Sequence, residues 1–76
     1  MIKKILVANR GEIAMRIFRT CRVMNISTVA VYTHVDRGAL HVRYAEEAYC
    51  ISNSPEDTSY LKPGLILAIA KKTGAA

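Results

Sequence analysis

The stretch "KILVANRGEIAMRIFRTC", residues 4–21, decides the fold. It passes from a short apolar run, through a single glycine, into a segment whose apolar residues recur at helical spacing. The nearly continuous apolar run Lys4–Ala8 is typical of a strand that is covered on both faces, as in a parallel sheet. Asn9 is then the predicted helix N-cap, with Glu12 as its partner three residues later, and Gly11 permits a tight turn.

The helix is predicted to run from about Gly11 to Met24, with two contrasting faces. Successive residues lie 100° apart, which gathers one broad apolar face for packing on the sheet: Ile13, Ala14, Ile17, Phe18, Cys21 and Met24. The opposite face carries Glu12, Arg16, Arg19 and Val23, with Met15 beside them. This outward face mixes charge with apolar side chains, so it fits either a contact surface or an ordinary solvated face.

The rest of the chain continues the alternation of strands and helices. A second strand is predicted at Thr28–Thr33 and a third near Ala48–Ile51, with one helical turn in the intervening loop 34–44. A final helix is predicted to begin near Pro63 and to end at Gly74, after which the pattern requires another strand. We therefore expect an α/β fold, a Rossmann-like parallel sheet with flanking helices, that is the incomplete opening part of a larger domain.

Composition narrows the function classes. The 76 residues make one small unit, 1–76, with a formal net charge of +5, yet no basic run is interleaved with aromatic residues as nucleic-acid binding requires. No apolar run reaches the length of a signal peptide core or a membrane span. Cys21 and Cys50 lie in apolar segments without paired spacing, so both are predicted to be buried, reduced thiols, as in the cytosol.

The chemistry-bearing residues do not assemble into a site. Of the three glycines of the dinucleotide fingerprint, only Gly11 is present, although Asp36 follows the second strand as that fingerprint asks. His34 and His41 with Asp36 do not form a closed metal-ligand set, and we expect both to be ordinary loop histidines. No spacing supports a catalytic triad or a carboxylate pair. We predict a structural corner at Asn9, Gly11 and Glu12, with a freestanding nucleotide-binding or protein-interaction module as the alternative.

Three blocks of the sequence resemble a known family. "KILVANRGEIAMRI", "TVAVYTHVDRGALHVRYAEEAYCI" and "SYL" (residues 59–61), in this order and spacing, resemble the N-terminal domain of biotin carboxylase, found in acetyl-CoA, propionyl-CoA, methylcrotonyl-CoA and pyruvate carboxylases. The resemblance implies a pre-ATP-grasp fold that precedes the ATP-grasp domains, where ATP, Mg and bicarbonate form carboxyphosphate and biotin is carboxylated.

The same resemblance implies that the chemistry lies outside this chain. The ligase residues that bind ATP, metal and biotin follow this region in the family, so we expect no catalytic, cofactor-binding or metal-binding residue here. The parent enzyme would use ATP, Mg, biotin and bicarbonate, whereas the 76-residue chain alone is predicted to be inactive.

What the resemblance does carry over is a surface and a set of partners. In similar bacterial enzymes the first helix lies at a dimer interface, and the arginines that match Arg16 and Arg19 face the partner. An acidic residue is common where this chain has Val23, so a charge pair across that interface is expected to be absent. The implied partners are the rest of the biotin carboxylase chain, a second copy in a homodimer, the biotin carboxyl carrier and the carboxyltransferase, in the cytoplasm, with no nucleic acid or membrane.

The segment before the last helix departs from the family. Its usual "SYLN" is "SYLK" here, so Lys62 and Pro63 replace an asparagine cap whose loss typically costs ~1 kcal/mol. An isolated sheet with an uncovered edge also predicts marginal stability or association through that edge.

Overall fold

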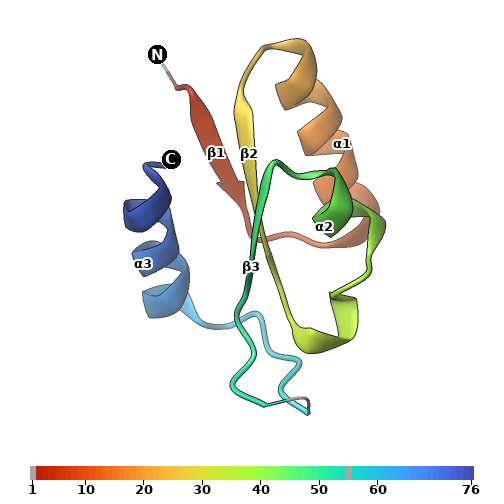
Figure 1. The fold of residues 1–76 in the computed structure, drawn as a ribbon, viewed down its shortest axis with the longest axis vertical. Coiled ribbons are helices and arrows are strands. Elements are labelled where there is room, and N and C mark those ends of the chain that lie inside the picture. The colour runs from red at the N-terminus through yellow and green to blue at the C-terminus, as the bar shows by residue number, and fades with distance from the viewer. Residues whose placement is uncertain (1, 55) are drawn as a thin grey trace.

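Three parallel strands form the centre of the molecule. The computed structural model describes residues 2–54 and 56–76. The strands are β1 (Lys4–Val7), β2 (Ser27–Tyr32) and β3 (Glu47–Cys50), in the order β1-β2-β3, with β2 in the middle (Figure 1). All three predicted strands and the parallel α/β fold are confirmed.

Helices cover both faces of this sheet. They are α1 (Gly11–Val23), the 3-10 turn η1 (His34–Asp36), α2 (Leu40–Tyr44) and α3 (Pro63–Thr73). The helices α1 and α2 lie on one face, while α3 lies alone on the other (Figure 1). No helix within the described residues is long and apolar enough to cross a membrane.

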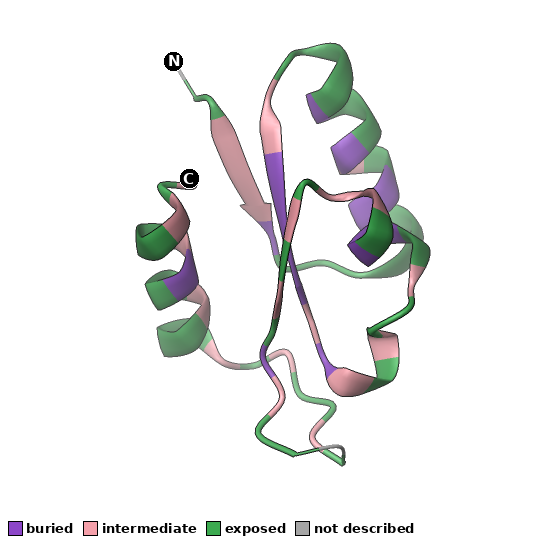
Figure 2. Cartoon of the chain, in the orientation of Figure 1, coloured by how far each residue is buried: buried purple, intermediate pink, exposed green. Residues whose placement is uncertain are grey.

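The core is two-sided because neighbouring residues of β2 point to opposite faces. Ala30 packs with Phe18 of α1, whereas Val29 and Val31 pack with Ile69 of α3. All three β2 residues are fully buried, and the buried colour in Figure 2 runs along this strand. The continuous apolar sequence of β2 is thus explained by burial on both faces.

The buried face of α1 differs from the predicted one. Met15 is 5% exposed, although it was placed on the outward face, while Ile13 and Met24 are 60% and 62% exposed. The reason is that α2 packs beside α1 and covers one flank, whereas the flank above β1 has no neighbouring helix among the described residues. Helical periodicity gives the width of an apolar face, but it cannot give the position of a second helix.

The start of α1 also corrects the prediction. Arg10, not Asn9, is the N-cap residue, and no side-chain hydrogen bond caps the helix from that position. No capping-box hydrogen bond from Glu12 is found among the described residues, and its carboxylate lies 3.8 Å from Arg19. Gly11 adopts φ +63°, a left-handed conformation that favours glycine. The sharp turn predicted at Gly11 is present, but it is not held in the expected way.

The predicted end of α3 is confirmed and leads the chain back to the sheet. Gly74 has φ +76°, and the N–H groups of Gly74 and Ala75 donate to the carbonyl of Ala70. Ala76 then donates to the carbonyl of Lys4 at 2.9 Å and accepts from the N–H of Leu6 at 3.1 Å. A further strand pairing thus starts at the outer edge of β1, where the sequence pattern requires another strand.

The two cysteines differ. Cys21 is buried in α1 as predicted, but Cys50 is exposed, so the prediction of two buried thiols is wrong for Cys50. The side chains of β3 alternate between half-buried and exposed because β3 is an edge strand. Ala48 and Cys50 occupy its exposed positions.

A matched pair of glycine substitutions tests the left-handed turn. Gly11→Ala is expected to lower the free energy of unfolding by about 1–2 kcal/mol, because alanine must adopt the left-handed conformation. Gly64→Ala, in α3 with open space around it and no positive φ, is expected to raise that free energy by about 0.5–1 kcal/mol. Urea unfolding followed by circular dichroism measures both, and a neutral Gly11→Ala would contradict the expectation.

Candidate functional site

The loop between β1 and α1 has the position at which α/β proteins commonly bind a nucleotide. It lies at the carboxyl end of β1, where many α/β proteins place a phosphate on the free N–H groups of the following helix. Such a site needs open N–H groups, space for the ligand, and an acidic residue beyond the second strand for a ribose.

The first N–H of α1 is already bound by a side chain. The N–H of Gly11 donates to Nδ1 of His41, which lies 3.3 Å away. His41 comes from α2 and is only 2% exposed, so its imidazole accepts this bond from a buried position although Gly11 itself is exposed. The imidazole thus satisfies one of the orphan N–H groups that every helix start leaves. The expectation of an ordinary loop histidine is wrong for His41.

The other ring nitrogen of His41 has a different environment. Nε2 is buried and has no hydrogen-bond partner among the described residues. Because Nδ1 accepts a hydrogen bond, the neutral ring carries its proton on Nε2. Burial lowers the pKa of His41, while the nearby charges act in opposite directions, Asp36 raising the pKa and Arg10 lowering it.

The acidic residue beyond β2 is likewise engaged within the chain. Asp36, in η1, accepts a hydrogen bond from the Tyr60 hydroxyl at 2.6 Å and one from Arg10 at 2.8 Å. The bond from Tyr60 is the main reason that the pKa of Asp36 is lowered, and Arg10 adds to the effect. The Tyr60 hydroxyl also accepts from the backbone N–H of Thr33 at 3.3 Å.

Side chains of the chain itself therefore occupy part of this corner. The two groups that a dinucleotide would use, the first helical N–H and the acidic residue beyond the second strand, are bound by His41 and by Arg10 with Tyr60. The chain joins three distant segments here, since Arg10 follows β1, Asp36 follows β2 and Tyr60 precedes α3. This arrangement links the three segments to one another.

His34, His41 and Asp36 do not form a set of metal ligands in the structure. His34 lies in η1, where its Nδ1 is 3.3 Å from the Arg37 guanidinium, while His41 is bound to Gly11. Within residues 2–54 and 56–76, no group of three or more His, Cys, Asp or Glu side chains could hold a metal ion.

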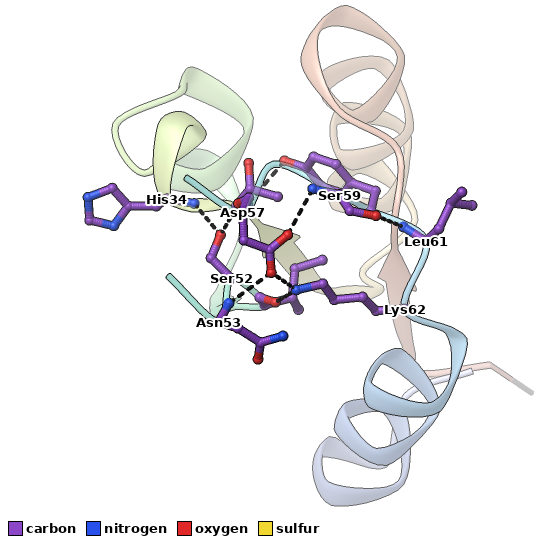
Figure 3. Close-up of polar contacts among 10 residues, drawn as sticks. His34, Ser52, Asn53, Asp57, Ser59, Leu61 and Lys62 are labelled. Carbon is purple, nitrogen blue, oxygen red and sulfur yellow. Dashed lines mark hydrogen bonds and ion pairs between the residues drawn. The ribbon is translucent and has the colours of Figure 1, made fainter. Parts of the chain in front are cut away.

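A second polar cluster holds the loop between β3 and α3. The Asp57 carboxylate accepts from the backbone N–H groups of Asn53 at 2.9 Å and Ser59 at 3.2 Å, and it pairs with the Lys62 ammonium (Figure 3). These three donors lower the pKa of Asp57 to about 2, with Lys62 contributing most. Lys62 also donates to the carbonyl of Ile51 at 2.6 Å.

This cluster gives Lys62, which stands where the family usually has an asparagine cap, a role of its own. As expected, no side-chain hydrogen bond caps α3 at Lys62. Instead the lysine reaches back to the loop, and Ser52 connects the loop to η1 by accepting from the N–H of His34 at 2.8 Å. Sequence reasoning found the lost cap but missed the new ion pair, although a lysine five residues after an aspartate was a visible signal.

The residues predicted to form a dimer surface all lie on the outside. Arg16, Arg19 and Val23 are exposed on α1, and Val23 is 87% exposed. Arg19 has Glu12 as its neighbour, with 3.8 Å between their charged atoms. The mixed outward face is therefore present, apart from Met15, which is buried.

Comparison with known proteins gives a consistent result. The family model described as "Biotin carboxylase, N-terminal domain" matches residues 1–76. Biotin carboxylase 1 of Bacillus subtilis is 55% identical over 74 residues, and the biotin carboxylase of Pseudomonas aeruginosa is 48% identical over 75 residues. These matches cover 97% and 99% of this chain but only 16% and 17% of the relatives, so the chain spans about a sixth of their length.

Solved structures agree with the sequence relatives. The biotin carboxylase subunit of a pyruvate carboxylase superposes with a TM-score of 0.88 at 51% identity, over 99% of this chain and 16% of that one. A second solved structure is the biotin carboxylase domain dimer of Hydrogenobacter thermophilus 2-oxoglutarate carboxylase in complex with MgADP, ADP and bicarbonate. It superposes with a TM-score of 0.88 at 49% identity, over 99% of this chain and 16% of that one.

The burial of His41 predicts a loss of stability in mild acid. Because burial lowers its pKa in the folded state, the unfolded chain takes up the proton more readily as the pH falls. The contribution of neutral His41 to the free energy of unfolding is therefore fully present above the unfolded pKa of about 6.5. This contribution is lost as the pH falls from that value through the lower pKa of the folded state, by up to about 1.4 kcal/mol per pH unit.

Urea unfolding across this pH range, with two matched variants, measures the effect. His34→Gln is expected to keep the acid-dependent loss of unfolding free energy, while His41→Leu removes that loss and is less stable at neutral pH because Gly11 loses its acceptor. A pH profile of His41→Leu that matched the unmodified chain would show that another group is responsible.

The loop cluster predicts a pKa that depends on one lysine. Lys62→Met is expected to raise the pKa of Asp57 from about 2 toward 3.8, without reaching it, because the N–H donors of Asn53 and Ser59 remain. Carboxyl carbon chemical shifts followed during an acid titration give this pKa. Lys71→Met, on the exposed last turn of α3, is the control, and an unchanged Asp57 pKa in Lys62→Met would refute the assignment.

Proposed function

Because this chain belongs to the biotin carboxylase N-terminal domain family, we propose that it is the N-terminal part of a biotin carboxylase. That enzyme is the ATP-dependent ligase component of a biotin-dependent carboxylase, which carboxylates biotin with bicarbonate. The observation that carries the proposal is the match of the family model along all 76 residues, together with a TM-score of 0.88 to a solved biotin carboxylase subunit. ATP, Mg, bicarbonate and biotin are bound by the remainder of the enzyme in this proposal.

The role of this segment is structural. The left-handed turn at Gly11 starts α1 within the proposed structural corner of Asn9, Gly11 and Glu12, and the bond from Gly11 to His41 fixes α1 against α2. The side chains there are committed to the chain itself, which supports a scaffold role over the alternative of a freestanding nucleotide-binding module. The chain alone is inactive because it contributes no ligase residue.

The outward face of α1 is the contact with a second copy. Arg16 and Arg19 supply charge and donors there, and Val23 supplies an exposed apolar group of the kind that interface centres bury. Without an acidic residue at position 23, this homodimer depends more on apolar contact than on a charge pair. The biotin carboxyl carrier and a carboxyltransferase are the further partners of the whole enzyme in the cytoplasm.

A chimera tests the proposed function. This chain replaces the 74 matched residues of Bacillus subtilis biotin carboxylase 1, and the product is expected to keep biotin-stimulated, bicarbonate-dependent ATP hydrolysis within about tenfold of the parent rate. The 76-residue chain alone is expected to show none. Gly11→Ala in the chimera is expected to lower thermal stability while leaving the KM for ATP unchanged. A folded chimera without turnover, or a selective loss of ATP affinity in Gly11→Ala, would overturn the proposal.

The same chimera tests the dimer surface. Arg19→Glu is expected to raise the dimer dissociation constant by at least about tenfold, because it reverses a charge that meets the partner. Arg43→Glu, an exposed arginine on α2, is the matched control and is expected to leave the constant unchanged. Sedimentation velocity over a dilution series gives both values, and equal constants for the two variants would count against the surface.

A further inference from the structure

A small cleft opens beside the last turns of α1, at the amino end of β2. Its volume is about 150 Å³, and it is lined by Phe18, Arg22, Ile26, Thr28, Tyr44 and Glu46. A water molecule takes up about 30 Å³ of the liquid, so the cleft has room for about five waters and not for a drug-sized ligand. Because α1 begins at the corner and ends beside the cleft, the two lie at opposite ends of the sheet (Figure 1).

The cleft exists because α2 is much shorter than α1. The helix α2 has five residues and ends at Tyr44, whereas α1 has thirteen and continues to Val23. Beside the last turns of α1, the chain has already left α2 and turned into β3 (Figure 1). The buried ring of Phe18 and the half-buried side chain of Ile26 give the cleft an apolar lining there.

Two opposite charges stand on the walls of the cleft. Arg22 comes from α1 and Glu46 from the segment before β3, and both are exposed. The Arg22 guanidinium lies over the Tyr44 ring, 5.2 Å from its centroid, which favours one position for the cation. The pKa of Arg22 is raised by Tyr44 and, less strongly, by the charge of Glu46. Yet the residues that the structure describes form no ion pair between Arg22 and Glu46, so neither charge neutralises the other.

Thr28 adds a buried hydroxyl group to the cleft. Its side chain belongs to β2 and is only 4% exposed. The hydroxyl oxygen accepts from the backbone N–H of Glu46 at 3.1 Å, and the described part of the chain supplies no acceptor for the hydroxyl proton. A buried donor without an acceptor lowers stability, and such groups in proteins are usually satisfied by water or a ligand. An oxygen acceptor bound in the cleft would take up this proton.

We propose that this cleft binds a small neutral α-amino acid in its zwitterionic form. The ligand carboxylate accepts from the Arg22 guanidinium and the Thr28 hydroxyl, and the ligand ammonium group donates to the Glu46 carboxylate. A short side chain lies against Phe18 and Ile26. A simple anion would leave Glu46 without a partner, and a simple cation would do the same to Arg22. The inference does not rest on the proposed function, because it uses only residues of this chain.

Titration of the chimera with L-alanine tests the site. Propionate and ethylamine are the matched probes, because each is similar in size to alanine but keeps only one of its two charges. The signal of the Ile26 methyl group, labelled with ¹³C and assigned by its absence from Ile26→Val, reports binding in the cleft. L-Alanine is expected to shift this signal saturably with a dissociation constant in the millimolar range, and both probes are expected to bind at least about tenfold more weakly.

Two pairs of variants locate the binding. Arg22→Gln and Glu46→Gln are each expected to raise the dissociation constant of L-alanine at least about tenfold, because each removes one of the paired charges. Arg43→Gln and Glu56→Gln change exposed charges outside the cleft and are expected to leave the constant unchanged. All four side chains are exposed, so none of these substitutions disturbs the core.

Each contrary result would overturn the inference. Absence of a saturable shift at Ile26 would show that alanine does not bind there. Propionate or ethylamine binding as tightly as alanine would make this a site for a single charge. Equal losses in the cleft variants and the control variants would assign the attraction to the charge of the whole molecule. Turnover is not involved, so alanine binding to a chimera that lacks ATP hydrolysis would support the site while the proposed function fails.

Discussion

The burial of β2 on both of its faces is the constraint on which the rest of the structure depends. Val29 and Val31 need cover on one face and Ala30 on the other, so a single layer of helices could not satisfy this strand. The chain meets this need by placing α1 and α2 on one side and α3 on the other. Short strands and small side chains keep this two-sided core thin, which makes the polar contacts at its ends important.

Those polar contacts hold the loops at the carboxyl end of the sheet. His41 binds the start of α1, Tyr60 ties η1 to the segment before α3, and Lys62 ties that segment to the end of β3. Each contact links residues that are at least 11 positions apart in the sequence. A corner that many α/β proteins leave open for phosphate is used here to join loops.

The parts that the sequence predicted are those with a local cause. The three strands follow from apolar runs of strand length, and Gly11 and Gly74 mark turns that need a left-handed residue. The parts that it missed depend on neighbours far along the chain. Periodicity could not show that α2 packs beside α1 and that Met15 is buried, and nothing near Gly11 indicated that His41, thirty residues later, would bind the helix start. The exposure of Cys50 depends on the strand order, which a pattern along the chain does not contain.

The pairing of Ala76 with β1 has a consequence for the order of folding. Closing a long loop costs more chain entropy than closing a short one, and contacts between distant residues form late for that reason. The β1, α1 and β2 unit closes over about twenty residues, whereas the bonds from Ala76 to Lys4 and Leu6 span nearly the whole chain. A ribosome also releases the first unit earlier. The pairing at the outer edge of β1 is thus expected to form after the β1, α1 and β2 unit as the chain emerges.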